Sequence, residues 1–161
     1  MKATQKQSDE YYLRLAIEAA RKARANGNHP FGAVLVGPEG EVLLEGVNTV
    51  VTERDCTGHA ETNLMRDASK RFELAYLTRC TMYASTEPCP MCSTAIYWGG
   101  VSRVVFALNA ERIYALTGDD PQNPVFLAPT REILTRGRRK IEVVGPMLIE
   151  EALQVHDGFW K

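Results

Sequence analysis

The sequence has no hydrophobic run that approaches the length of a membrane span, and it has no marked excess of one charge. Its 19 basic and 20 acidic residues leave a formal net charge of −1 at pH 7, so nothing draws the chain as a whole to nucleic acid or to an anionic membrane. The first ten residues, MKATQKQSDE, are too polar for a secretory signal peptide. We therefore expect a cytoplasmic protein that has no membrane partner.

Cysteine is also scarce, with four in the whole chain: Cys56, Cys80, Cys89 and Cys92. In a reducing compartment such cysteines are metal ligands or free thiols rather than disulfides. Internal repeats, low-complexity tracts and linkers are absent as well. Because 161 residues are enough to bury most of a domain's apolar surface, we expect residues 1–161 to form a single domain.

What the sequence does contain is an alternation of helical and strand patterns. After Ser8, apolar residues recur at the spacing of one helix face until Asn26 and Gly27 end the helix. These apolar residues are Leu13, Ala16, Ile17 and Ala20. Further helices are expected over TGHAETNLMRDASK, PMCSTAIYWGG, NAERIYAL, PTREILTR and PMLIEEALQVHDGFWK, and strands over FGAVLVG, EVLLEGVNTV, CTMYAS, RVVFAL and KIEVV. Residues 118–128 are expected to form a loop. The order of elements predicts an α/β fold with one sheet covered on both faces.

A metal site is indicated by two short motifs, HAE at residues 59–61 and PCPMC at residues 88–92. Together they form H-x-E…P-C-x-x-C, which is the signature of zinc deaminases. His59, Cys89 and Cys92 would hold Zn²⁺ through three bonds and leave the fourth tetrahedral position to water. Zinc makes such a water acidic enough to supply hydroxide near neutral pH. The sequence therefore predicts one catalytic Zn²⁺ per subunit.

Both motifs fall at the starts of predicted helices, where the helix N-terminus stabilises a thiolate. Pro88 and Pro90 suit such a start, because a missing N–H costs little there. Glu61 lies two residues beyond His59, so it points to a different side of the helix and fits beside the bound water rather than on the metal. A carboxylate there can take the proton of the water and pass it to the ring nitrogen and the departing ammonia. We therefore predict that Glu61 is the catalytic acid–base.

A closed metal site is the competing interpretation. Cys56-x-x-His59 together with Cys89-x-x-Cys92 has the spacing of a four-ligand structural zinc site. If Cys56 occupied the fourth position, no water would bind and the protein would be a zinc-stabilised binding module without turnover. That interpretation leaves Glu61 without a role.

The motifs resemble those of the cytidine deaminase-like superfamily, and within it the short nucleobase and nucleoside deaminases. PFGAVLV, HAE, EPCPMC and AIYW are most similar to bacterial guanine deaminases and the related plant guanosine deaminases, over a stretch from about Phe31 to Asp120. The resemblance implies a three-layer α/β/α fold with a five-stranded mixed sheet, usually in a homodimer. It also implies the same three zinc ligands and the same proton shuttle.

The resemblance further implies contacts with a substrate base. Asn48 matches an asparagine whose side-chain amide binds the base, although an asparagine at a strand end is also a common turn residue. The backbone N–H of Ala60 would meet a ring carbonyl, and Phe31 would form a wall of the pocket or be plain core.

Two more expectations concern the later part of the chain. Asp120 matches an aspartate of guanine deaminases, and a carboxylate suits guanine because it accepts from a ring N–H or the exocyclic amine. However, Thr117 and Gly118 stand where that family has Gly-Phe, so the loop is expected to differ.

In several relatives an aromatic residue near the C-terminus covers the base. The candidates here are His156, Phe159 and Trp160.

The expected function is hydrolytic deamination of a small purine, either guanine, which would give xanthine and ammonia, or guanosine. Deamination of cytosine or of another aminated heterocycle is an alternative that the motifs leave open. A tRNA adenosine deaminase is another, because it shares both motifs and because a basic cluster is present at residues 131–140. The acidic residues of the last predicted helix speak against a nucleic-acid partner. The apolar AIYW segment offers area for the expected homodimer.

Overall fold

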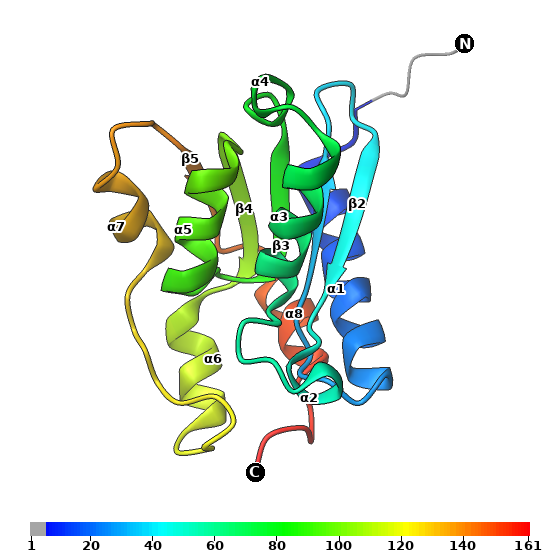
Figure 1. Cartoon of the computed structure of the whole chain (residues 1–161). Helices are drawn as coiled ribbons and strands as arrows, with labels where there is room; N and C mark the ends of the chain where they lie inside the picture. The colour runs from blue at the N-terminus through cyan, green and yellow to red at the C-terminus, as the bar shows by residue number, and fades with distance from the viewer. Residues whose placement is uncertain (1–5) are drawn as a thin grey trace.

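A computed structural model describes residues 6–161 of the chain, and Figure 1 shows its layers. Five strands form one mixed sheet in the order β2-β1-β3-β4-β5. β1 pairs antiparallel with both β2 and β3, whereas β3, β4 and β5 run parallel to one another. The strands are β1 (Gly32–Val36), β2 (Val42–Val47), β3 (Thr81–Thr86), β4 (Arg103–Leu108) and β5 (Glu142–Val144). The predicted five-stranded mixed sheet is therefore confirmed.

One face of the sheet packs against α1 (Asp9–Ala25) and α8 (Ile149–Gln154). Ser8 caps α1, since its side chain accepts a hydrogen bond from the backbone N–H of Tyr11 at 3.2 Å. The four apolar residues at helical spacing in α1 are all buried, as predicted. α1 comes very close to the sheet at Gly32, where an added Cβ would collide with the backbone of Ala16 and Ala20. Glycine is required there because of this approach.

The other face packs against α3 (Ala60–Arg71) and α5 (Pro90–Gly99). Alternation along β1 divides its side chains between the two cores: Val34 and Val36 join the α1 side, and Ala33 and Leu35 join the α3 side. Helices therefore cover both faces, which confirms the three-layer α/β/α fold (Figure 1).

The remaining helices are short: α2 (Val50–Glu53), α4 (Leu74–Leu77), α6 (Ala110–Thr117) and α7 (Thr130–Thr135). α2 and α4 were not predicted, because a single turn is too short to show a periodic pattern. None of the helices between residues 6 and 161 is both long and apolar enough to cross a membrane.

The last predicted helix is wrong at both of its ends. Leu148 has a left-handed backbone conformation with φ of 56°, so α8 begins only after it. The helix also ends at Gln154, and residues 155–159 continue in turns. These turns bring Trp160 against His29, with ring centroids 5.4 Å apart. Packing of the terminal aromatic residues thus replaces the helix that periodicity predicts.

Candidate active site

The predicted site residues converge at one edge of the sheet. β3 ends there at Thr86 and leads within three residues to Cys89. β1 runs in the opposite direction, so Phe31, which directly precedes it, lies at the same edge. β2 is antiparallel to β1 and therefore delivers Asn48 to this edge as well. Residues far apart in sequence thus surround one cavity.

His59, Cys89 and Cys92 form a compact group at this edge. The Sγ atoms of Cys89 and Cys92 lie 3.5 and 3.6 Å from Nδ1 of His59. His59 and Cys89 are the N-cap residues of α3 and α5, and Cys92 lies in the first turn of α5. The start of α3 is close to β2, because an added Cβ at Gly46 would collide with the carbonyl of Ala60. The two helix starts therefore present all three side chains together.

The distances in this group fit a zinc ion. Tetrahedral zinc has Zn–N bonds of about 2.0–2.1 Å and Zn–S bonds of about 2.3 Å, which place a ligand nitrogen and a ligand sulfur about 3.6 Å apart. The two measured S–N distances agree with this value. One imidazole and two thiols are also a ligand set that zinc prefers. His59, Cys89 and Cys92 are therefore suited to hold Zn²⁺.

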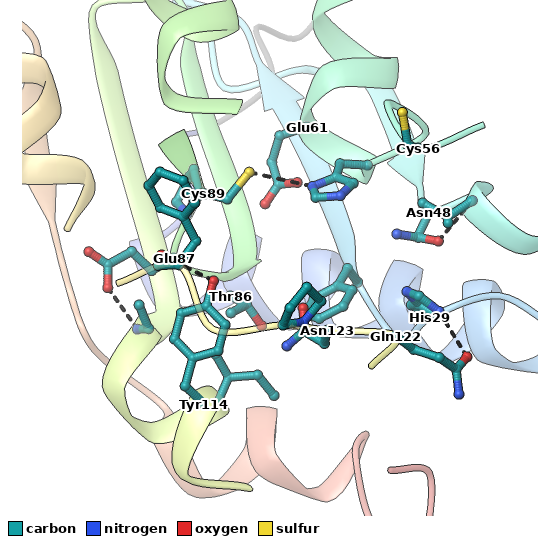
Figure 2. A pocket seen from close by; sticks show the side chains of 18 of the residues that line it. His29, Asn48, Cys56, Glu61, Thr86, Glu87, Cys89, Tyr114, Gln122 and Asn123 are labelled. Carbon is teal, nitrogen blue, oxygen red and sulfur yellow. Dashed lines mark hydrogen bonds between the residues drawn. The ribbon is translucent and has the colours of Figure 1, made fainter. Parts of the chain in front are cut away.

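Cys56 does not complete a four-ligand site. The metal-binding group found among residues 6–161 has three members and does not include Cys56, whose side chain is exposed. Figure 2 shows its sulfur pointing away from Glu61 and Cys89. The closed structural site that the spacing of Cys56 and His59 allows therefore does not form.

The two thiols influence each other's ionisation. The interaction with Cys92 is the main cause that lowers the pKa of Cys89, with a further contribution from His59. The same interaction, together with burial, raises the pKa of Cys92. The hydroxyl of Thr62 lies 3.2 Å from the Cys92 sulfur and fixes its position on the α3 side. A divalent cation bound here would displace the remaining thiol proton, since metal-bound thiols are deprotonated.

Glu61 lies in the first turn of α3, and 5% of its surface is exposed. Burial, and after it the negative charge of Cys89, raise the pKa of its carboxyl to about 7. Figure 2 shows the carboxylate directed toward the cavity beside Cys89. Glu61 is thus next to the metal ligands and faces the space that a substrate would occupy, as the sequence predicts for an acid–base.

The cavity at this edge has a volume of about 310 Å³. His59, Cys89 and Glu61 form one end of its lining, and Phe31 lies on its wall. Other walls come from α6 and from the loop at residues 118–128, which the sequence correctly predicts as a loop. The residues from these two segments include Ile113, Tyr114, Gln122, Asn123 and Phe126.

Asn48 lines the cavity and is 1% exposed. Its Oδ1 accepts a hydrogen bond from the N–H of Val50 at 3.1 Å, which leaves the amide NH₂ group as its remaining polar function. Ala60 is the first residue of α3, where a backbone N–H has no partner within the helix. Contacts of Asn48, Ala60 and Phe31 with a substrate stay predictions, and the positions of the three residues at this edge are compatible with them.

Asp120 does not line the cavity. It is buried, and its two carboxylate oxygens accept backbone hydrogen bonds from Gln122 and Lys161, each at 2.9 Å. The hydrogen bond from Lys161 is the main cause that lowers the pKa of Asp120. Its visible role is to tie the C-terminus to the loop, and a contact with guanine has no support from this geometry.

The three C-terminal candidates also lie outside the lining, directly behind it. His156 packs against Phe31 with ring centroids 5.4 Å apart, and its Nδ1 accepts a hydrogen bond from Nε1 of Trp160 at 3.0 Å. Phe159 and Trp160 pack against His29. These aromatic residues support the cavity wall from behind, whereas the sequence predicts that they cover the base.

Sequence reasoning missed several lining residues, among them His29, Gln122 and Asn123. His29 could have been predicted from the sequence, because it stands two residues before Phe31 and therefore lies at the same edge of the sheet. Gln122 and Asn123 carry no such signal, since they belong to an irregular loop that does not resemble the family pattern. Only the three-dimensional fold brings them to the cavity.

A zinc site of one histidine and two cysteines in the H-x-E…P-C-x-x-C arrangement, with a buried glutamate beside it, is typical of the zinc-dependent deaminases. Comparisons with known proteins agree. The family model for the cytidine and deoxycytidylate deaminase zinc-binding region matches residues 6–108, and the chain belongs to this family.

Known relatives differ in the base on which they act. The chain is 40% identical over 154 residues to a probable cytosine deaminase of Schizosaccharomyces pombe, with 96% of this chain and 93% of the relative covered. It is 41% identical over 99 residues to the guanine deaminase of Bacillus subtilis, covering 61% and 63% of the two chains. A crystal structure of a mutant of NE0047 in complex with 8-azaguanine is similar with a TM-score of 0.77 and 26% identity, covering 92% of this chain and 82% of the other.

Proposed function

We propose that this protein deaminates a small free nucleobase, cytosine or guanine, by hydrolysis. The observation that carries the proposal is a cavity of about 310 Å³ with the metal ligands and Glu61 at one end. This volume is at the lower limit of typical small-molecule pockets, which span about 300–1,000 Å³, so it suits a single base. Phe31 on the wall offers a flat apolar face for an aromatic ring.

The reaction replaces an amine by an oxygen. Water first adds to the amine-bearing ring carbon and the C–N bond to the amine then breaks, so the products are ammonia with uracil from cytosine or xanthine from guanine. When bound by His59, Cys89 and Cys92, Zn²⁺ supplies the Lewis acidity that activates water near neutral pH. The Glu61 carboxylate takes one proton of the attacking water and delivers it to the ring nitrogen. It then takes the second proton, from the added hydroxyl, and delivers it to the leaving amine. The burial of Glu61 keeps bulk water away from this transfer.

Of the two bases, cytosine is the first substrate to test. One relative that is 40% identical over nearly the whole chain is a probable cytosine deaminase. Asp120 was the residue of the sequence that best suited guanine, and both oxygens of its carboxylate already accept hydrogen bonds from backbone N–H groups. Guanine stays the second candidate because the B. subtilis guanine deaminase and the structure with bound 8-azaguanine are also similar.

Deamination of adenosine in tRNA has less support. The basic cluster that suggested it borders a different groove, which is lined by Arg131, Arg138, Arg139 and Lys140 and shares no residue with the catalytic cavity. Arg139 is also occupied, because its guanidinium donates to the carbonyls of Tyr97 and Val101 at 2.6 and 2.8 Å. Arg139 thus has a structural role at the end of α5.

The test is an ammonia-release assay of the zinc-loaded protein with cytosine, guanine, guanosine, cytidine, adenine and a small aminated triazine. Release from cytosine or guanine is the expected result, and the Glu61→Gln variant serves as the blank. An inosine assay on unmodified tRNA runs in parallel. Activity on tRNA alone, or on none of the six compounds, would contradict the proposal.

The proposed enzyme works as a cytoplasmic homodimer. Trp98 on α5 is 78% exposed and Phe126, which lines the cavity, is 66% exposed, so apolar surface is available for a second copy. Sedimentation of the purified protein at micromolar concentration tests the stoichiometry, and a monomer would contradict this part of the proposal.

A further inference from the structure

His29 is a polar residue on the cavity wall that the proposed chemistry does not use. Its side chain lines the cavity, and 5% of its surface is exposed. Phe159 and Trp160 pack against the ring from behind, with centroids 6.0 and 5.4 Å away. The preceding residue, Asn28, is held as well, because its Oδ1 accepts the N–H groups of Val51 and Thr52 at the start of α2. The imidazole is therefore held in a fixed position.

Gln122 determines which nitrogen of His29 carries the proton. Nε2 of His29 lies 3.3 Å from Oε1 of Gln122, an oxygen that can only accept. The neutral imidazole therefore has its proton on Nε2, and Nδ1 is left as an acceptor that has no hydrogen-bond partner among residues 6–161. Burial lowers the pKa of His29, which favours the neutral ring.

Asn48 complements this acceptor with a donor. Figure 2 shows Asn48 and His29 on the same side of the cavity, and the Oδ1 of Asn48 is already bonded to the N–H of Val50. This wall therefore presents one hydrogen-bond donor, the NH₂ group of Asn48, and one acceptor, Nδ1 of His29. A ring carbonyl next to a ring N–H presents the matching pair. Cytosine and guanine both contain such a lactam, and adenine does not.

We propose that His29 is a substrate-recognition residue, and that its Nδ1 accepts a hydrogen bond from the ring N–H of a lactam-bearing base. Gln122 is the positioning residue for His29, because it holds the proton on Nε2. Asp120 fixes this part of the loop, since its Oδ1 accepts the backbone N–H of Gln122 while its Oδ2 accepts that of Lys161. The inference rests on the proposed function and names the chemical feature that the same site selects.

The experiment compares each base with an analogue that keeps the amine but lacks the lactam. The pairs are cytosine with 4-aminopyrimidine and guanine with 2-aminopurine. His29→Leu removes the acceptor, and His29→Asn keeps an oxygen near the position of Nδ1. Gln122→Leu removes the partner of Nε2, and Gln154→Leu, at an exposed position on α8, is its matched control.

We expect His29→Leu to lower kcat/KM for the lactam base about tenfold or more, because one hydrogen bond of typical strength corresponds to that factor. The kcat/KM for the analogue should change less than about threefold, so the ratio of kcat/KM for the lactam base to kcat/KM for its analogue falls. His29→Asn should restore most of the ratio, and Gln122→Leu should raise KM for the lactam base with little change in kcat. Gln154→Leu should behave as the wild type. An equal loss on both members of a pair, or no rescue by asparagine, would overturn the role of His29 while the proposed function stands.

A binding measurement separates the two proposals. Trp160 lies against His29, so its fluorescence in a Trp98→Phe background reports binding of uracil and xanthine, the products, without turnover. Tenfold weaker binding in His29→Leu supports the inference even if no base is deaminated, which would sink the proposed function alone. Binding that is unchanged by His29→Leu overturns the inference.

Discussion

At the scale of single residues, Glu61 combines deep burial with closeness to the metal ligands. We predict that Glu61→Gln keeps the zinc content of the protein and lowers kcat by about 10²-fold or more, because glutamine cannot carry the proton from water to the leaving amine. The substitution is nearly isosteric, so folding should be unaffected. Metal analysis and ammonia release measure the two effects, with the exposed Glu150→Gln as control. A Glu61→Gln variant that turns over at the wild-type rate would refute the assignment.

Cys56 is the residue that decides between an open and a closed metal site. Its thiol is exposed and lies outside the group formed by His59, Cys89 and Cys92. Cys56→Ser should therefore retain one zinc per chain and a kcat/KM within about threefold of the wild type. Cys92→Ser, by contrast, should lose the metal, because it removes one of only three ligands. Metal analysis of both variants after dialysis tests this, and zinc loss in Cys56→Ser would restore the four-ligand interpretation.

At the scale of secondary-structure elements, Glu87 joins β3 to two helix starts. Its Oε2 accepts the N–H of Ala110 in α6 at 2.7 Å, and its Oε1 accepts the N–H of Thr130 in α7 at 3.0 Å. A carboxylate suits two helix N-termini, whereas an amide NH₂ would face one of the N–H groups. Glu87→Gln should therefore lower the free energy of unfolding by about 1–3 kcal/mol.

Urea denaturation measures this loss. Glu132→Gln on α7 is the matched control, because it removes only an exposed ion pair with Arg136 and should change the free energy of unfolding by less than about 0.5 kcal/mol. Equal effects of the two variants would show that the bonds of Glu87 to α6 and α7 add nothing to stability.

The elements also show why some parts of the site were predictable. His59, Cys89 and Cys92 follow from local rules, since ligand type, spacing and helix starts are all written in short stretches. The pairing of His29 with Gln122 is different, because it joins residues 93 positions apart and depends on an irregular loop. The predicted extent of the last helix, α8, was wrong for a related reason. Its apolar periodicity continues past Gln154, but the backbone conformation of Leu148 and the packing of Trp160 override it.

At the scale of the whole molecule, the C-terminal segment fastens the first helix to the cavity wall. Arg24 of α1 donates to the carbonyl of Val155 at 2.7 Å, and its guanidinium lies over the ring of Phe159. Lys161 donates its N–H to Asp120, and His156 packs against Phe31. The segment thus connects α1, β1 and the loop that carries Gln122, so its stability and the shape of the cavity depend on each other.

His156 makes this connection sensitive to pH. It is 2% exposed, and burial, aided by the charge of Arg24, lowers its pKa to about 4, whereas a histidine in an unfolded chain titrates near 6.5. At a pH between these two values, His156 is protonated in the unfolded chain but neutral in the folded chain. The free energy of unfolding should therefore fall as the pH drops from about 6.5 toward 4, by up to about 3 kcal/mol from this residue.

The matching variant is His156→Gln, which loses the titrating group. At pH 7.5 it should be less stable than the wild type, because Trp160 loses the ring on which it stacks. The difference in the free energy of unfolding between the two proteins should narrow steadily at pH 6.0 and 5.0. The reason is that only the wild type loses stability from a histidine that is protonated in the unfolded chain and stays neutral in the folded one. His29 and His59 are present in both proteins, so their titrations cancel in the comparison. Urea denaturation curves that stay equally far apart across this range would mean that His156 takes up its proton in the folded protein without cost, and that the C-terminal segment is open to water.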